Sequence, residues 1–218
     1  APFPLRRYDM AIGDTNVAIC NKALLFLGAN KITSFSEASA SADACNLLYN
    51  EIKKSTLAMY SWSFSLGKAT LARETTTPVS EWTYQYALPN DMLSGVPRAV
   101  RASTIAGSPL IKNWEIGQSS VGGTVLFSDE ETITIDYQKD VDEGAMPSYF
   151  VQLLAYQLAW HLAETITDQT GKVEVWRNIA LGNPGEGMRG GYFRQAVSID
   201  SAGQTPGVIS DYMLTEIR

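Results

Sequence analysis

The sequence is poor in the residues from which metal centres and disulfide frameworks are built. Its 218 residues include two cysteines and one histidine, too few for a structural zinc site with Cys and His ligands. Cys20 and Cys45 each fall on the apolar stripe of an expected helix, which favours buried free thiols over a disulfide. We therefore expect neither a metal site nor a disulfide framework.

Charged residues are also scarce, at 18% of the chain against roughly 25% in an average globular protein. The 17 Lys and Arg stand against 23 Asp and Glu, so the net charge is −6 with the histidine neutral. An acidic chain is poorly suited to bind the nucleic-acid backbone, and we expect no specific DNA binding. The low charge favours a surface that is neutral or buried against other copies, and we expect a homo-oligomer.

Long hydrophobic runs are missing as well. The first ten residues, APFPLRRYDM, lack an apolar core of signal-peptide length, so secretion is not indicated. The uncharged stretch between Glu143 and Glu164 only just reaches the roughly 20 residues that span a bilayer. It contains Pro147, Gln152 and His161, which favour a buried helix, and we expect no membrane partner.

Helical spacing marks both ends of the chain. A first helix is expected between an N-cap at Asp14 and a stop at Gly28, and a second from Ser39 to Tyr60. A third begins at Pro147 and carries apolar residues to Ile166. Shorter helices are expected around residues 173–180 and 192–201, on either side of the glycine-rich segment 182–191.

Between Leu66 and Tyr137 the hydrophobic period changes from 3.6 to 2, which indicates strands. Residues 82–88 alternate aromatic or leucine side chains with smaller ones. Residues 123–127 and 133–137 are expected to form an antiparallel hairpin around an acidic turn at 128–130. Because no crossover helices separate these strands, a parallel nucleotide-binding sheet is not expected.

The sequence therefore predicts an α+β fold, with an antiparallel helical bundle core, an inserted antiparallel β lobe and extended termini. Trp62, Phe64 and the face formed by Leu153, Leu158 and Leu162 should share the helical core. The expected parts are an N-terminal arm (1–13), a helical core (14–64 and 145–203), an inserted β domain (65–144) and a C-terminal docking tail (204–218).

The known catalytic patterns are not found. Segment 182–191 lacks the GxxxxGK[ST] pattern and contains no lysine, which favours a linker or loop over a phosphate site. His161 is expected to be a structural histidine on a core helix, and no serine lies in a GxSxG pattern. We expect no catalytic residues, no cofactor-binding residues, no metal site and no enzymatic activity.

An alternative from another class stays open, that of a glycan hydrolase or sugar-binding module. The row of Trp82, Tyr84 and Tyr86 could stack on sugar rings, although at strand spacing it more simply forms the buried face of a sheet. Carboxylates on or beside the β lobe could supply the acid pair of a glycosidase. They are Glu81, Asp91, Asp136, Asp140, Asp142 and Glu143.

Several short blocks follow one another in an order that resembles a known family. They are AICNKAL (18–24), ITSF (32–35), YSWSF (60–64), KATLA (68–72), WTYQYALPND (82–91) and IDY (135–137). In this order they resemble the tail tubular protein A family, the head-to-tail adaptor proteins of short-tailed bacteriophages. The similarity covers roughly residues 14–170, and W-x-F followed by Y-x-Y-x-L-P-x-D is its most specific combination.

The resemblance implies a structural ring subunit, commonly in twelve copies, that joins the portal to the tail and forms part of the DNA ejection channel. The implied partners are the portal protein and the next tail protein, a nozzle or tail tubular protein B-like component, while DNA passes without specific binding. The implied location is the virion, at the phage neck and tail, after assembly in the host cytoplasm. The alternative then becomes an envelope-glycan hydrolase or sugar-binding module of the phage tail.

The C-terminal tail carries the candidate partner-docking residues. Beyond a hinge at residues 204–207, Ile209, Tyr212, Met213 and Ile217 are spaced to suit a helix laid in a groove. We expect this tail to become ordered on docking, because the partner surface offsets its folding cost. The alternative is a tail packed on its own subunit. Residues 1–13 are a second candidate for contact with an adjacent copy.

Overall fold

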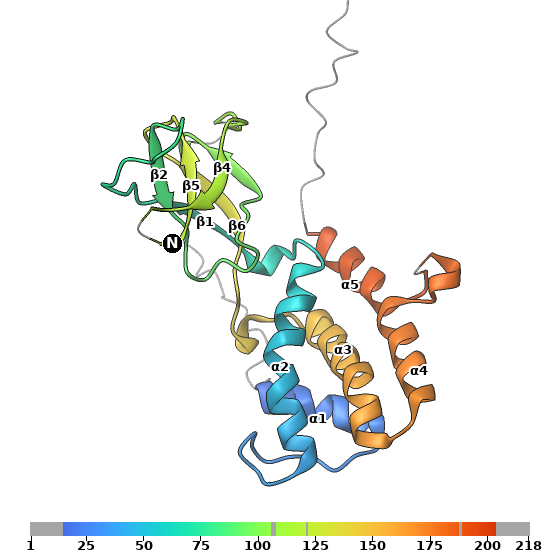
Figure 1. The fold of residues 1–218 in the computed structure, drawn as a ribbon. Coiled ribbons are helices and arrows are strands. Elements are labelled where there is room, and N and C mark those ends of the chain that lie inside the picture. Colours follow the sequence, from blue (N-terminus) through green and yellow to red (C-terminus); the bar gives the residue numbers. More distant parts are fainter. Residues whose placement is uncertain (1–14, 106–107, 121, 188, 204–218) are drawn as a thin grey trace, which may run out of the picture.

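The computed structural model describes residues 15–105, 108–120, 122–187 and 189–203. Within these residues the fold is α+β, with five α-helices and two small antiparallel sheets of three strands each. Two helices precede the strands and three follow them, so the chain passes between helices and strands twice (Figure 1). We call residues 66–138 the β lobe and the described residues 15–65 and 139–203 the helical part.

Helix α1 (Asn16–Leu27) has a defined cap at each end. The Thr15 hydroxyl accepts a hydrogen bond from the backbone nitrogen of Ala18 at 3.1 Å and caps the first turn. The N-cap is therefore Thr15 instead of Asp14, which lies outside the described residues. Gly28 ends the helix as expected, with a φ of 76° that glycine adopts without strain.

The other helices lie where helical spacing predicted them. Helix α2 (Ala40–Ala58) begins after Ser39, whose side chain accepts a hydrogen bond from Ala42 N at 3.3 Å. The later helices are α3 (Ser148–Thr167), α4 (Thr170–Leu181) and α5 (Tyr192–Ser201).

The described residues of the glycine-rich segment form a close turn between α4 and α5. A Cβ atom on Gly191 would lie 2.2 Å from the backbone nitrogen of Gly182, so this approach requires glycine. Asn183 and Arg189 form an antiparallel bridge across the turn. The segment is thus the interhelical loop that the sequence predicted.

The six strands divide between two sheets. The first sheet has the order β1 (Leu66–Thr70), β6 (Thr134–Gln138), β3 (Ala99–Arg101). The second has the order β2 (Tyr84–Ala87), β5 (Thr124–Ser128), β4 (Glu115–Gln118). Residues 71–74 connect them, because Leu71 N donates to Ile133 O at 2.8 Å while Glu74 N donates to Gln85 O at 2.9 Å.

The expected hairpin around residues 128–130 is wrong. Strands β5 and β6 do not pair, since β5 lies in the second sheet and β6 in the first. The chain leaves the second sheet after β5, where Asp129 binds Thr83, and joins the first sheet near Ile133. The hairpin forms between β4 and β5, where Gly122 and Gly123 adopt φ values of 94° and 96° in the turn.

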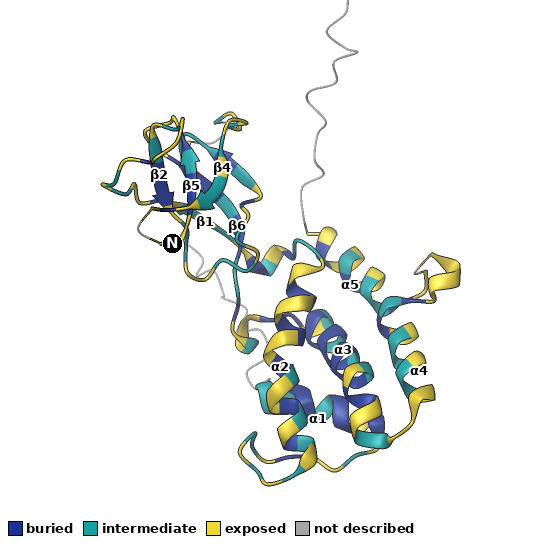
Figure 2. Cartoon of the chain, in the orientation of Figure 1, coloured by how far each residue is buried: buried dark blue, intermediate teal, exposed yellow. Residues whose placement is uncertain are grey.

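Each part of the chain has its own hydrophobic cluster. In the helical part, Trp62, Leu153, Leu158 and Leu162 are fully buried together and Phe64 packs against them, as predicted. Buried residues concentrate where α1 and α3 face each other (Figure 2). The β-lobe cluster consists of Leu71, Tyr86, Val100, Leu126, Ile133, Ile135 and Tyr137.

Cys20 and Cys45 are free and buried, as predicted. A hydrogen bond with Cys45, together with burial, raises the pKa of the Cys20 thiol, which keeps it protonated and unreactive. His161, expected as a structural histidine on a core helix, is exposed and contacts Trp160. One helical residue turns the chain by about 100°, which takes His161 away from the face of Leu162. Among the described residues, no helix is both long and apolar enough to cross a membrane.

Candidate functional site

The candidate docking residues of the tail, Ile209, Tyr212, Met213 and Ile217, lie outside the described residues, as does the arm at 1–13. The described residues offer two other places to consider. One is the junction between the β lobe and the helical part. The other is the face of the first sheet that points away from the β-lobe cluster.

Gln138, the last residue of β6, connects the β lobe to the end of α2. Its amide nitrogen donates to the carbonyl oxygens of Leu57 at 2.6 Å and Tyr60 at 2.8 Å, and lies 3.1 Å from Ser65 Oγ. The residue is 4% exposed. An amide has two N–H donors, so both are satisfied inside the junction.

A buried lysine attaches the segment after β6, where the chain returns from the β lobe to the helical part, to the same helix α2. Lys53 on α2 is 7% exposed, and its Nζ lies 3.1 Å from Asp140 Oδ1 and 3.5 Å from Glu143 Oε1. The Tyr49 hydroxyl donates to Glu143 Oε1 at 3.0 Å. Burial, and then the neighbouring Glu143, raise the pKa of Tyr49, so this hydroxyl stays a donor. The segment between β6 and α3 is therefore attached to α2.

Asp200 on α5 binds the YSWSF block through Ser63. It is 3% exposed and accepts hydrogen bonds from Ser63 Oγ at 2.7 Å and from the Tyr149 hydroxyl at 2.6 Å. Ser63 N also donates to Asp200 Oδ2 at 3.0 Å. Burial and the bond to Asp200 raise the pKa of Tyr149. The segment between α2 and β1, where the chain first passes from the helical part to the β lobe, is thus bound to both α3 and α5.

The loop after β2 completes the junction. The Tyr137 hydroxyl lies 3.0 and 3.2 Å from the two carboxylate oxygens of Asp91. Leu93 N donates to Gln138 O at 2.8 Å, and Leu93 packs against the helical cluster. Residues from the YSWSF, WTYQYALPND and IDY blocks therefore lie at or beside one junction, although they are distant in sequence.

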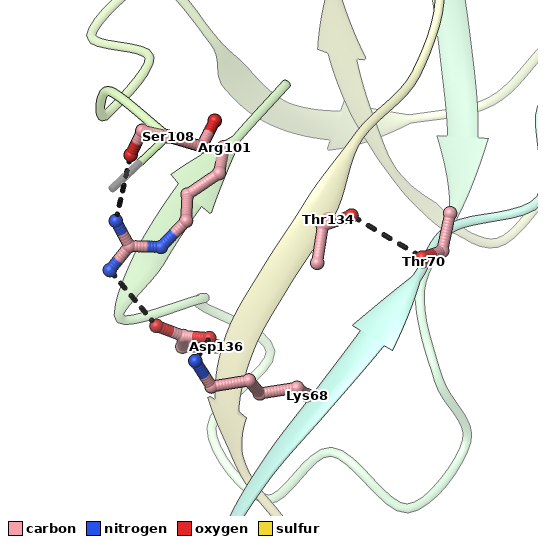
Figure 3. Close-up of polar contacts among 6 residues, drawn as sticks. All are labelled: Lys68, Thr70, Arg101, Ser108, Thr134 and Asp136. Carbon is pink, nitrogen blue, oxygen red and sulfur yellow. Dashed lines mark hydrogen bonds and ion pairs between the residues drawn. The ribbon is translucent and has the colours of Figure 1, made fainter. Parts of the chain in front are cut away.

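The outer face of the first sheet carries polar side chains around a hollow of about 290 Å³. Asp136 in the central strand lies between two cations, with Oδ2 3.3 Å from Arg101 Nη2 and Oδ1 3.5 Å from Lys68 Nζ (Figure 3). Thr70 and Thr134 share a hydrogen bond of 3.3 Å. The described lining residues are Lys68, Ala69, Thr70, Arg101, Ser103, Thr104, Ile105, Thr134 and Asp136.

This hollow is better suited to bind an anionic group than to cleave a glycosidic bond. A glycosidase places two carboxyl groups across the scissile bond, and Asp136 is the single carboxylate among the described lining residues. That carboxylate already neutralises part of the charge of Lys68 and Arg101. The Lys68 side chain is exposed and that of Arg101 is half-buried, and the hydroxyls of Thr70, Ser103 and Thr104 also line the hollow.

The other predicted carboxylates lie away from this hollow. Asp91, Asp140 and Asp142 line one hollow of about 300 Å³ at the junction, beside Lys53 and Lys54. Asp140 and Glu143 are paired with Lys53, whereas Glu81 is exposed before β2. Among the described residues, no group of three or more His, Cys, Asp or Glu is arranged to hold a metal ion.

The aromatic row of β2 is mostly part of the β-lobe core. Tyr86 is 1% exposed and its hydroxyl donates to the carbonyl of Glu130, while Tyr84 and Leu88 pack against the same cluster. Burial raises the pKa of Tyr86. Trp82 is half-buried, and its indole nitrogen donates to Glu115 at 3.2 Å. The preferred interpretation, a buried sheet face, is confirmed for Tyr86, whereas Tyr84 and Leu88 are half-buried and pack against the edge of the cluster.

Sequence reasoning missed Lys53, Gln138 and Asp200. A signal existed for Lys53, because a lysine adjoining Ile52 and Thr56 on the apolar side of a helix needs a buried partner. No local pattern marks Gln138 or Asp200, whose side-chain partners are 51 to 137 residues away along the chain.

No protein-family model matches this sequence, and no curated protein matches it.

Proposed function

We propose that the protein is a structural subunit of the head-to-tail adaptor ring of a short-tailed bacteriophage, of the tail tubular protein A type. In this role it joins the portal to the next tail protein and forms part of the channel through which DNA leaves the head. Its work is mechanical, with no catalytic residues, cofactor or metal. It is assembled in the host cytoplasm and functions in the virion.

The observation that carries this proposal is the meeting of the family-like blocks at the lobe junction. Trp62 of the YSWSF block packs against Phe150 of α3, in the helical cluster, with ring centroids 5.2 Å apart. Tyr137 binds Asp91, and its neighbour Gln138 binds the carbonyl of Tyr60. Chance similarity of short blocks gives no reason for them to pack on one another. Their convergence supports a shared architecture.

The proposal includes the finer architecture that the resemblance implies. The helices would form an antiparallel bundle as the body of each subunit, with the β lobe inserted between the second and third helices. The termini would extend to neighbouring proteins. A closed ring requires every copy to present its surfaces at the same angle. The buried contacts of Gln138, Lys53 and Asp200 favour a fixed lobe orientation, which suits that requirement.

The direct test is assembly of the full chain. We expect light scattering and negative-stain imaging to show rings at high protein concentration, and the protein to attach to portal-bearing phage heads. A protein that stays monomeric, fails to attach and instead cleaves or binds a cell-wall glycan would support the alternative function.

The docking tail is tested by deleting residues 205–218. We expect the shortened subunit to keep its fold by circular dichroism and to lose attachment to portal-bearing heads, because Ile209, Tyr212, Met213 and Ile217 are removed. Loss of folding would show that the tail packs on its own subunit. Normal attachment by a folded truncation would contradict the docking role.

A further inference from the structure

We propose that the outer face of the first sheet binds the acidic turn, residues 129–131, of a neighbouring copy of this chain. This inference rests on the proposed ring and identifies a contact that would join adjacent subunits. It is carried by charge complementarity between two described surfaces of the β lobe.

The receiving surface exposes positive charge. The Lys68 side chain is 75% exposed beside the hollow, and exposed Arg98 lines the adjoining recess. Asp136 lies between Lys68 and Arg101, with 22% of its side chain exposed and its Oδ1 atom buried. The accessible groups are therefore cations, together with the hydroxyls of exposed Thr70 and Thr104 and half-buried Ser103. Carboxylates are the natural complement of such a surface.

The acidic turn is ordered before any partner arrives. Asp129 Oδ1 accepts hydrogen bonds from Thr83 N at 2.9 Å and Thr83 Oγ1 at 2.8 Å. The Tyr86 hydroxyl donates to the carbonyl of Glu130, so the backbone is attached to the β-lobe core. The side chains of Glu130 and Glu131 are exposed. A turn that is already ordered loses little conformational entropy when it binds.

The two surfaces differ, which determines the kind of contact they make. The turn leaves the second sheet after β5, whereas the hollow lies on the outer face of the first sheet. A contact between unlike patches can run head to tail, and head-to-tail contacts close into rings when the rotation allows. The pairing of opposite charges would also establish the register between copies.

The test uses charge reversal in the full chain. Glu130→Lys/Glu131→Lys places a basic turn against a basic face, and Lys68→Glu/Arg98→Glu places an acidic turn against an acidic face. Each variant alone should form rings at least about tenfold less well than wild type, because like charges then meet. The matched control, Glu174→Lys/Glu186→Lys, changes exposed acidic residues of the helical part and should assemble normally.

An equal mixture of the two variants should restore rings, because alternating copies make every contact complementary again. Analytical ultracentrifugation measures the assembly, and circular dichroism checks that each variant is folded. Three results would overturn the inference and leave the adaptor proposal intact. The Glu130→Lys/Glu131→Lys variant could form rings at the wild-type level, the mixture could fail to form rings, or the mixture could stop at dimers. Absence of rings and of head attachment in the wild type would instead refute the adaptor function, and this inference with it.

Discussion

A few buried polar side chains attach the β lobe to the helices. Gln138 binds two carbonyl groups near the end of α2, and Lys53 binds two carboxylates on the segment that leads to α3. Gln138 and Lys53 are themselves buried, so removing one partner from either contact leaves polar groups that lose a hydrogen bond or ion pair with little water to replace it. These residues therefore contribute to stability and to the orientation of the lobe together.

Replacing Gln138 should show both effects. Gln138→Ala removes the side-chain donor to the carbonyls of Leu57 and Tyr60, and we expect a loss of about 1–3 kcal/mol in the free energy of unfolding. Urea denaturation measures it, and hydrogen exchange in residues 59–65 should become faster. The exposed Gln195→Ala is the control and should change stability by less than about 0.5 kcal/mol. Equal stability of the two variants would contradict the role given to Gln138.

The buried face of α3 makes a second prediction. Leu158 is fully buried in the helical cluster, so Leu158→Ala should lower the free energy of unfolding by about 2–5 kcal/mol through lost contacts and a cavity. Leu47 is 77% exposed on α2, and Leu47→Ala serves as the control. Thermal and urea denaturation compare them, and a near-wild-type melting temperature for Leu158→Ala would show that this face is wrongly assigned.

Helices α2 and α3 each bind an acidic partner through a tyrosine. Tyr49 on α2 donates to Glu143, and Tyr149 on α3 donates to Asp200. In both cases burial is the first cause that raises the tyrosine pKa, and the neighbouring carboxylate raises it further. Deprotonation would therefore place two negative charges at each contact.

These contacts predict a loss of stability in alkali. A tyrosine whose pKa is higher in the folded state contributes fully below its unfolded pKa of about 10, and the contribution is lost as the pH rises through the folded value. Urea denaturation between about pH 8 and pH 11.5 should show this decline, with a shallower slope for Tyr49→Phe. Leu158→Ala, which removes no tyrosine, should keep the wild-type slope. An unchanged slope in Tyr49→Phe would contradict the linkage.

At the scale of the whole molecule, the charge of the chain determines how the proposed ring interacts with DNA. The net charge of −6 per chain gives a ring an average field that repels the DNA backbone. The exposed cations of the first sheet lie close to Asp136 and are few. The charge pattern thus suits pairing between copies more than retention of a passing genome.

We therefore expect negligible affinity for duplex DNA at physiological salt. Gel retardation or fluorescence anisotropy with micromolar protein measures it, in the assembled state. A retarded complex whose affinity falls steeply with salt concentration would show that phosphates are bound, contrary to this expectation. Lys68→Glu/Arg98→Glu in the mixed ring is a useful comparison, because it removes the most exposed cations beside the hollow.

The sequence by itself determined the local elements of this protein. Ser39 and Gly28 mark helix ends because capping depends on neighbouring backbone groups. The apolar spacing of α3 and the alternation in β2 predicted buried faces for the same reason, since both periods follow from local geometry. The α+β class and the burial of Trp62 and Cys45 followed from these patterns.

Only the tertiary structure decided which elements meet. The partners of β5 and β6 were predicted wrongly, because strand pairing depends on distant segments such as β1 and β2. The same holds for Gln138 and Asp200, whose partners come from another part of the chain. The hollow at Asp136 also needs three strands that are separated in sequence. Spacing along a chain records neighbours within an element, whereas contacts between elements depend on how the whole chain packs.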